Sequence, residues 1–143
     1  MVRLIMGGKG TGKTKQLIEI INAAAAEDAG NVVCIEATSS MTFDIHYHVR
    51  LLSAAEYQVA SYERLKGFIS GLYAGNYDIS QIFIDNLFKI VGGDCNQETD
   101  HFLNWLEKFS SQYGVKFTVA ASIDPAFATD GMRQYLGSDA SGK

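Results

Sequence analysis

The sequence contains only two cysteines and a single proline among its 143 residues, and it has no long apolar run. No stretch reaches the roughly 18 apolar residues that a membrane span needs, so no span is predicted. The N-terminus lacks a basic segment followed by a long apolar core, so no secretory signal is predicted. Cys34 and Cys95 lie far apart without metal-ligand spacing, which indicates buried or incidental thiols. Together these absences predict a soluble cytoplasmic protein.

The sequence also lacks an excess of positive charge. Its formal net charge is −4 at pH 7. A large surface for sequence-independent nucleic-acid binding needs clustered lysine and arginine, so the charge does not indicate nucleic acid as a partner. A local basic patch stays open as an alternative.

No internal repeat or low-complexity linker interrupts the chain. At this length, and with 47% hydrophobic residues, we expect one ordinary core and a single domain over residues 1–136. Residues 137–143 are mostly small and polar, which predicts a flexible C-terminal tail.

Strand and helix patterns alternate along the sequence. Short apolar runs predict strands at 2–6, 31–37, 80–86 and 115–122, and a short one at 57–61. Periodic apolar residues predict helices at 14–29, 62–74 and 98–113. In the region 38–56 we expect a polar loop followed by a short helix at 48–55. Pro125 predicts a turn that starts a last short helix. This alternation predicts a three-layer α/β/α sandwich with a mostly parallel sheet.

The first predicted strand runs into a glycine-rich octet that matches the pattern G-x-x-x-x-G-K-[ST]. The octet consists of Gly7, Gly8, Lys9, Gly10, Thr11, Gly12, Lys13 and Thr14. Glycines let the backbone curl so that successive N–H groups point at phosphate oxygens, and the following helix adds the positive end of its dipole. We expect Lys13 to reach the β- and γ-phosphates and the Thr14 hydroxyl to ligate Mg²⁺. The flanking strand and amphipathic helix favour a phosphate site over an ordinary glycine-rich turn.

With this octet as a Walker A motif, the sequence resembles the P-loop NTPase superfamily, and the alternating pattern extends the resemblance over nearly the whole chain. The resemblance implies a P-loop NTPase fold that binds ATP, or another NTP, with Mg²⁺. The ParA/MinD group has an extra lysine as the second octet residue; here that residue is Gly8 and Lys9 comes third, so the resemblance does not extend to that group. The N-K-x-D tetrad of Ras-type GTPases does not occur, which favours ATP.

Asp85 ends the apolar run of the strand predicted at 80–86. A magnesium–nucleotide site needs a carboxylate near the end of a neighbouring strand, and this run resembles the Walker B motif, whose Asp holds the metal. The resemblance therefore implies Thr14 and Asp85 as metal-binding residues. Many related ATPases have a catalytic glutamate after this aspartate, but here the next residue is Asn86. An amide cannot act as a general base, so either hydrolysis is weak or the base lies elsewhere.

Glu36 is the best substitute for that base, because it ends the strand predicted at 31–37. Parallel α/β sheets bind ligands outside the carboxyl ends of their strands, so we expect Glu36 to face the same crevice as the octet. The arrangement resembles the RecA-like group, in which such a glutamate orients the attacking water, and this implies Lys13 and Glu36 as catalytic residues. An ordinary carboxylate that caps or pairs at a strand end remains the alternative.

Ser122 ends the last predicted strand. In the same superfamily, a polar residue that ends the strand beside the P-loop strand can sense the γ-phosphate. The resemblance therefore implies a nucleotide-binding role for Ser122, while a strand-ending serine without a function stays the alternative.

Three functions stay open from the sequence. The first is a small RecA-like ATPase with slow Mg²⁺-dependent hydrolysis. Related proteins often assemble as rings or filaments and borrow an arginine from a neighbour, which leaves a homo-oligomer or a separate protein partner open, with Arg50, Arg64 and Arg133 as candidates. The second is a small nucleotide or metabolite kinase, although the few arginines are widely scattered. The third is a non-hydrolysing ATP-binding regulatory or adaptor module, which Asn86 keeps open.

Overall fold

The computed structural model describes residues 1–8, 12–38 and 44–136. Within these ranges, five strands form one sheet in the order β1-β5-β4-β2-β3, and every neighbouring pair is parallel. The strands are β1 (Val2–Met6), β2 (Asn31–Glu36), β3 (Arg50–Ser53), β4 (Ile79–Asp85) and β5 (Lys116–Ala121). The helices are α1 (Lys13–Glu27), α2 (Tyr62–Gly75), α3 (Leu87–Val91), α4 (Gln97–Tyr113) and α5 (Asp130–Arg133), with a 3₁₀ turn, η1, at Pro125–Phe127.

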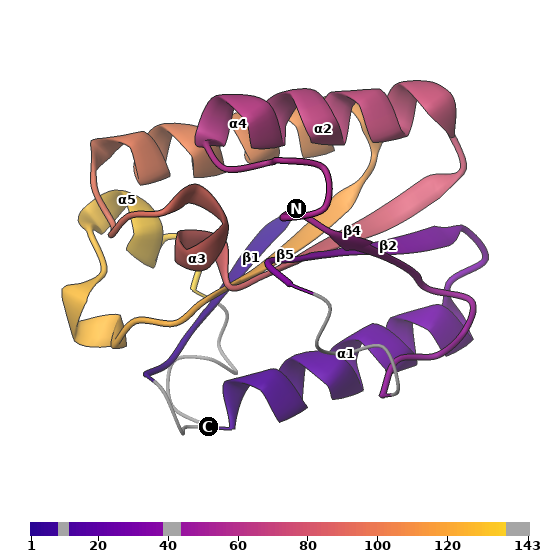
Figure 1. The fold of residues 1–143 in the computed structure, drawn as a ribbon, viewed down its shortest axis with the longest axis horizontal. Coiled ribbons are helices and arrows are strands. Elements are labelled where there is room, and N and C mark those ends of the chain that lie inside the picture. The colour runs from indigo at the N-terminus through magenta and orange to yellow at the C-terminus, as the bar shows by residue number, and fades with distance from the viewer. Residues whose placement is uncertain (9–11, 39–43, 137–143) are drawn as a thin grey trace.

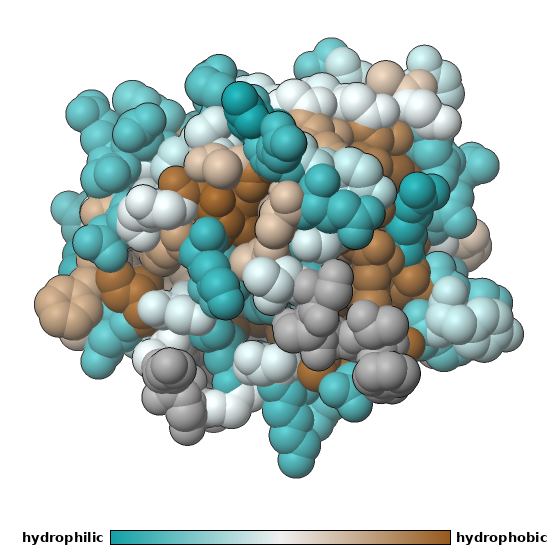
Figure 2. All heavy atoms as spheres, viewed as in Figure 1, coloured by the Kyte–Doolittle hydropathy of each residue, from teal (hydrophilic) through white to brown (hydrophobic). Residues whose placement is uncertain are grey.

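Helices cover both faces of the sheet (Figure 1). The long helix α1 lies below the sheet in this view, and α2 and α4 lie above it. The predicted three-layer α/β/α sandwich is confirmed, and its sheet is wholly parallel in the described residues. Figure 2 shows the outer surface in the same view, with hydrophilic side chains over most of the rim and apolar ones between them.

Alternate residues of each strand pack into two separate apolar cores, because successive side chains of a strand point to opposite faces of the sheet. In β1, Leu4 joins the core under α2 and α4, whereas Ile5 joins the core against α1. In β4, Ile84 and Phe83 divide in the same way. Parallel strands that are covered on both faces have continuous apolar sequences. Such runs are easy to recognise, which explains why these strands could be predicted.

Two predictions for the region after β2 are wrong. Residues 48–55 do not form a helix, because Arg50–Ser53 pair with β2 as the edge strand β3, with Leu52 buried. Residues 57–61 do not form a strand, because a turn occupies the start of that segment. Gln58 has a left-handed backbone with φ 59°, and the Val59 amide donates back to the Ala54 carbonyl at 2.9 Å. A left-handed residue interrupts the extended backbone that a strand requires.

The last described residues return to β1. The Leu4 amide donates to the Tyr135 carbonyl at 2.7 Å, and Leu4 forms a parallel bridge with Leu136 on the side of β1 away from β5. The Tyr135 hydroxyl donates to Asn104 Oδ1 of α4 at 2.6 Å, which ties this segment to the upper helix layer. Pro125 begins a 3₁₀ turn before α5, as predicted. The tail predicted at 137–143 lies outside the described residues.

None of the helices in the described ranges has the length and apolar character that crossing a bilayer demands.

Candidate functional site

The carboxyl ends of the parallel strands gather the predicted site residues at one edge of the sheet. Gly7 follows β1, Ser122 follows β5, and Asp85 and Glu36 end β4 and β2. The strand β5 lies between β1 and β4, so Ser122 follows the strand that pairs with β1. In this topology, every predicted residue that follows or ends a strand lies on the side of the sheet where α/β proteins bind ligands.

Lys13 and Ser122 meet at this edge. The Lys13 ammonium donates a hydrogen bond from Nζ to Ser122 Oγ at 2.8 Å, across 109 residues of sequence. Lys13 is the first residue of α1 and is buried, whereas the Ser122 residue is exposed. The structure thus joins the end of the predicted octet to the residue that follows β5. The nucleotide-sensing role of Ser122 stays a prediction.

The helix α1 begins directly at the octet. Gly12 holds φ 78°, a left-handed conformation that a side chain would strain, and it lets the chain turn from loop into helix. Among the described residues, no side chain caps this helix start, and its first turn contains no acidic residue. The N-terminal N–H groups and the positive end of the helix dipole are therefore available to an anion. Lys9, Gly10 and Thr11 lie outside the described residues, so their predicted contacts with phosphate stay predictions.

A cavity of about 590 Å³ opens beside the start of α1. Its described lining consists of Gly8, Gly12, Lys13, Thr14, Asn86, Lys89 and Ser122. Small-molecule sites typically have volumes of about 300–1,000 Å³, so the cavity is of ordinary ligand size. The charged side chains in this described lining are both lysines, which suits a polyanionic ligand.

Two buried carboxylates lie side by side at the carboxyl ends of β2 and β4. Glu36 and Asp85 are partners in the register of these strands, and their residues are only 2% and 8% exposed. Burial raises the pKa of Asp85, and the neighbouring Glu36 charge raises it further, while Lys13 and Lys89 lower it. A buried carboxylate whose charged form is disfavoured in this way is stabilised by a bound cation.

These residues fit a magnesium ion that is held together with phosphate. In the described residues, no group of three or more His, Cys, Asp or Glu side chains is placed to hold a metal by itself. Mg²⁺ usually takes one or two carboxylates and completes its shell with water and substrate phosphates. The Asp85 carboxylate and the Thr14 hydroxyl match such a partial donor set. Their metal-binding role stays a prediction.

Glu36 does not line the cavity in the described part of the chain. Its residue is 2% exposed, and its carbonyl accepts a hydrogen bond from the Ala54 amide at 2.7 Å, where the chain turns after β3. Glu36 is therefore buried beside Asp85, and neither carboxylate belongs to the described cavity lining. The sequence predicted its place at the carboxyl edge but not its burial.

Cys34 lies on β2 two residues before Glu36 and is buried against α1, as predicted for an incidental thiol. Burial raises the pKa of the Cys34 thiol well above its usual range, and the charges of Asp85 and Glu36 raise it further. This thiol therefore stays protonated at neutral pH.

None of the three candidate arginines belongs to the described cavity lining. The Arg64 guanidinium donates from Nη1 to the Gln58 carbonyl at 2.9 Å, and Arg133 forms an ion pair with Asp130. Arg50 begins β3, at the amino ends of the strands. The described cavity lining contains Lys89 instead, on α3, a helix that the sequence analysis did not predict. The signal that could have found it is a lysine four residues after Asp85.

No protein-family model matches this chain, and no curated protein matches it in sequence. Among solved structures, it is similar to the flagellar accessory protein FlaH from Methanocaldococcus jannaschii, with a TM-score of 0.57 and 10% identity. The likeness covers 93% of this chain but 65% of the FlaH chain, so this chain spans just under two thirds of that protein. Identity this low shows the fold alone. It agrees with the fold class described above, an α/β sandwich whose sheet is parallel throughout the described residues.

Proposed function

We propose that this protein binds ATP, or another nucleoside triphosphate, with Mg²⁺ at the carboxyl edge of its sheet, and that it hydrolyses the nucleotide slowly. The observation that carries the proposal is the 2.8 Å hydrogen bond from Lys13 to Ser122 at the wall of the 590 Å³ cavity. It brings the glycine-rich octet and the end of β5 to one ligand-sized hollow at a helix N-terminus. The fold and the octet sequence support the same conclusion.

Phosphate binding follows from the groups at the start of α1. The octet backbone and the first N–H groups of α1 donate to phosphate oxygens, and the helix dipole favours their negative charge. A lysine ammonium has three donors, so Lys13 can keep Ser122 while it donates to the β- and γ-phosphates. Thr14 and Asp85 would hold Mg²⁺, which neutralises charge on the β- and γ-phosphate oxygens.

Hydrolysis in this proposal depends on Glu36, which would orient the attacking water and accept its proton. The residue is only 2% exposed, so water must gain access to its buried carboxylate before Glu36 can act. Asn86, which follows Asp85, has no basic group that could replace it. We therefore expect slow hydrolysis, because catalysis would depend on positioning and charge stabilisation while the base, Glu36, is buried.

The same burial favours a second candidate, an ATP-binding regulatory module with no turnover. If Glu36 stays buried when nucleotide is bound, no other group among the described cavity residues can act as a general base. The kinase alternative gains no comparable support, because the described cavity lining contains no arginine that could hold a transferred phosphoryl group.

Nucleotide binding and phosphate release measured on the same preparation separate these candidates. We expect the unaltered protein to release phosphate slowly with Mg²⁺, and Glu36→Gln to reduce that rate at least 10-fold while ATP still binds. Unchanged turnover in Glu36→Gln would show that another group acts as the base. ATP binding without any ADP formation would favour the regulatory module, and absence of ATP binding would contradict the proposal. Glu107→Gln, which changes a half-buried carboxylate on α4, is the matched control.

A further inference from the structure

Another cavity lies at the opposite end of the sheet, where β2, β3 and β4 begin. It measures about 410 Å³, and its lining includes the first residues of these strands, Asn31, Arg50 and Ile79, together with the end of α2. None of the predicted phosphate-binding or metal-binding residues belongs to its described lining. Small-molecule sites typically measure about 300–1,000 Å³, so this cavity is large enough for a separate small ligand.

Two glycines at the end of α2 leave this space open. Leu65 and Ile69 of the same helix are fully buried, and Leu72 packs partly against their core. Gly71 and Gly75 line the cavity, and a Cβ at either position would meet no atom within 4 Å. Glycine is unfavourable inside a helix, and no contact among the described residues requires it at these positions. The missing side chains therefore leave room that the protein itself does not fill.

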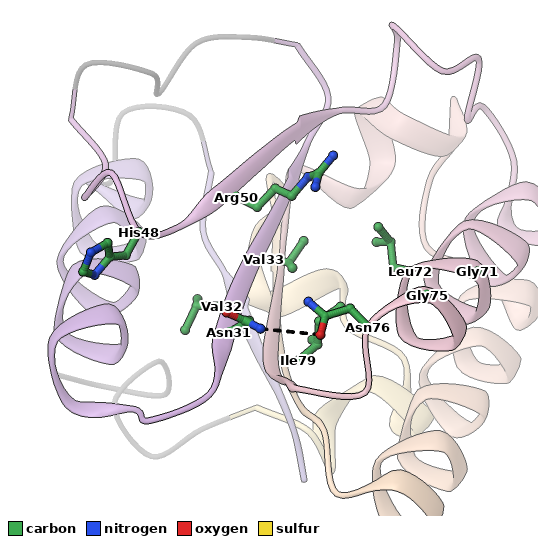
Figure 3. A pocket seen from close by; sticks show the side chains of 10 residues that line it. All are labelled: Asn31, Val32, Val33, His48, Arg50, Gly71, Leu72, Gly75, Asn76 and Ile79. Atoms are coloured by element: carbon green, nitrogen blue, oxygen red, sulfur yellow. Dashed lines mark hydrogen bonds between the residues drawn. The ribbon is translucent and has the colours of Figure 1, made fainter.

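The lining of this cavity is polar on two sides and apolar between them. Figure 3 shows Arg50 on one side, Asn31 and Asn76 facing each other on the other, and Val33 and Leu72 between them. Val33 is buried and Leu72 is half-buried, whereas Arg50 and both asparagines are exposed. A planar heterocycle has the complementary distribution, because its faces are apolar and its edges carry the hydrogen-bonding groups.

The two asparagines hold each other in one orientation. Asn76 Oδ1 accepts hydrogen bonds from the Asp78 amide at 3.0 Å and from Asn31 Nδ2 at 3.5 Å. These bonds leave the Asn76 NH₂ group as a donor and Asn31 Oδ1 as an acceptor, and neither atom has a partner among the described residues. An amide edge, in which a carbonyl lies next to an N–H, offers one acceptor and one donor to match them.

The charges around the cavity favour an uncharged ligand. Arg50 makes no hydrogen bond or ion pair with any residue that the structure describes, so its positive charge opposes a cation. The last turn of α2 contains no basic residue and presents the negative end of the helix dipole, which opposes an anion. The Arg50 guanidinium still offers its donors to carbonyl oxygens.

We propose that this cavity binds an uncharged heterocycle with an amide edge, of the kind that pyrimidine bases have. The amide edge pairs with Asn31 and Asn76, the faces of the ring lie against Val33 and Leu72, and carbonyl oxygen on the other edge faces Arg50. This site is separate from the proposed nucleotide site and does not depend on it.

NMR titration of the ¹⁵N-labelled protein with uracil tests this assignment. We expect saturable shifts at the side-chain amides of Asn31 and Asn76 and at the backbone amides of Gly71 and Gly75, with the weak affinity typical of so small a ligand. The analogue 1,3-dimethyluracil keeps the ring and its carbonyls but lacks both N–H donors, so we expect it to bind about 10-fold more weakly. Orotate, which adds a carboxylate to the ring, should also bind more weakly than uracil.

Two substitutions test whether uracil occupies this cavity. Asn76→Asp keeps the oxygen that accepts from Asp78 and Asn31 but removes the NH₂ donor, and it should weaken uracil binding about 10-fold. Gly71→Leu adds a side chain at the cavity wall and should weaken binding by about 10-fold or more. Gly67→Leu is the matched control on α2, because a Cβ there also meets no atom within 4 Å and Gly67 is outside the described lining. Its affinity should stay within about 2-fold, and circular dichroism checks the fold of each variant.

Several results would contradict this site. Absence of saturable uracil shifts in the folded protein would overturn it, and so would equal affinities for uracil and 1,3-dimethyluracil. Tighter binding of orotate than of uracil would show that the ligand class is anionic instead. Unchanged uracil affinity in both Asn76→Asp and Gly71→Leu would place the ligand elsewhere. The titration contains no nucleoside triphosphate, so its outcome is independent of the proposed function.

Discussion

Cavities lie at both ends of the sheet, and they differ in how their side chains are arranged. A cavity at the carboxyl end measures about 590 Å³, and one at the amino end measures about 410 Å³. At the carboxyl end, Lys13 is directed onto Ser122. At the amino end, Figure 3 shows Arg50 extending away from Asn31 and Asn76, which face each other. The two cavities therefore differ in whether the charged side chain at each one is directed toward another polar residue of the lining.

The helix ends differ as well. The carboxyl end has the uncapped N-terminus of α1, which favours negative charge. The amino end has the last turn of α2, where Gly71 and Gly75 line the hollow and the helix presents carbonyl oxygens. An anion is therefore favoured at one end and disfavoured at the other. Helix polarity and converging donors, more than volume, therefore distinguish the carboxyl end as the end where we propose that phosphate binds.

The largest effect on this comparison is expected from Lys13→Ala. Lys13 is buried and hydrogen-bonded beside the cavity, and truncating a buried charged donor costs about 2–5 kcal/mol. We expect ATP affinity to fall about 100-fold or more in calorimetry. Circular dichroism provides the folding control. If a folded Lys13→Ala protein binds ATP as tightly as before, the carboxyl end is not the site.

At the amino end we expect Gly30→Ala to damage stability while nucleotide binding survives. A Cβ at Gly30 would lie 2.6 Å from the Ser80 Cβ and 2.9 Å from the Asp78 carbonyl oxygen, so the backbone must shift. Overpacking of this kind costs about 1–3 kcal/mol, measurable by urea unfolding. ATP affinity at 20 °C should stay within about 2-fold of the unaltered protein. A stable variant that loses ATP binding would link the two ends and contradict the comparison.

Asp85→Asn should reduce the Mg²⁺ dependence of binding at the carboxyl end. We expect the gain in ATP affinity on adding Mg²⁺ to fall about 10-fold, because a neutral amide is a poorer ligand than a carboxylate. Calorimetry with and without EDTA measures that gain. An undiminished gain would remove Asp85 from the metal site.

We also expect the effect of Asp85→Asn on the melting temperature to depend on pH. Burial raises the folded-state pKa of Asp85 above its usual value, so keeping this group charged costs stability at neutral pH. As the pH falls through the folded pKa, the folded protein takes up the proton first and that cost disappears. Asp85→Asn should therefore have a melting temperature equal to or above that of the unaltered protein at pH 7. The difference should shrink toward acidic pH; a difference that grows there would contradict the effect of burial.

The smallest effect is expected from Arg50→Ala. Arg50 is exposed at the amino end of β3 and lines the other hollow. We expect ATP affinity to change less than about 2-fold, because a single exposed charge distant from the ligand is largely screened. Calorimetry beside Lys13→Ala gives the contrast directly. A large loss of affinity in Arg50→Ala would place a nucleotide contact at the wrong end of the sheet.

The sequence predicted most of the fold because its buried strands and long helices carry strong local patterns. The edge strand β3 was missed because its four residues are held extended by pairing with β2, which no local pattern reveals. The helix α3 was missed because five residues are too few to show helical periodicity. Lys89 was missed together with α3.

For the site, the octet and Asp85 could be recognised because they are local motifs. The resemblance to a superfamily implied a nucleotide-binding role for both Lys13 and Ser122, but their hydrogen bond was not predicted, because 109 residues separate them. Glu36 is contacted by the turn after β3, where the Ala54 amide donates to its carbonyl, and that turn was predicted incorrectly. Features that arise from long-range packing around a motif were therefore the hardest to predict.

The buried thiol of Cys34 has a practical consequence for labelling this protein. Alkylating reagents attack the thiolate, and burial beside two carboxylates keeps Cys34 in its unreactive thiol form. Cys95, the other cysteine in the chain, is partly exposed just before α4. A maleimide dye should therefore attach to the native protein at Cys95 alone. The unaltered chain then carries a single fluorophore in the loop that joins α3 to α4.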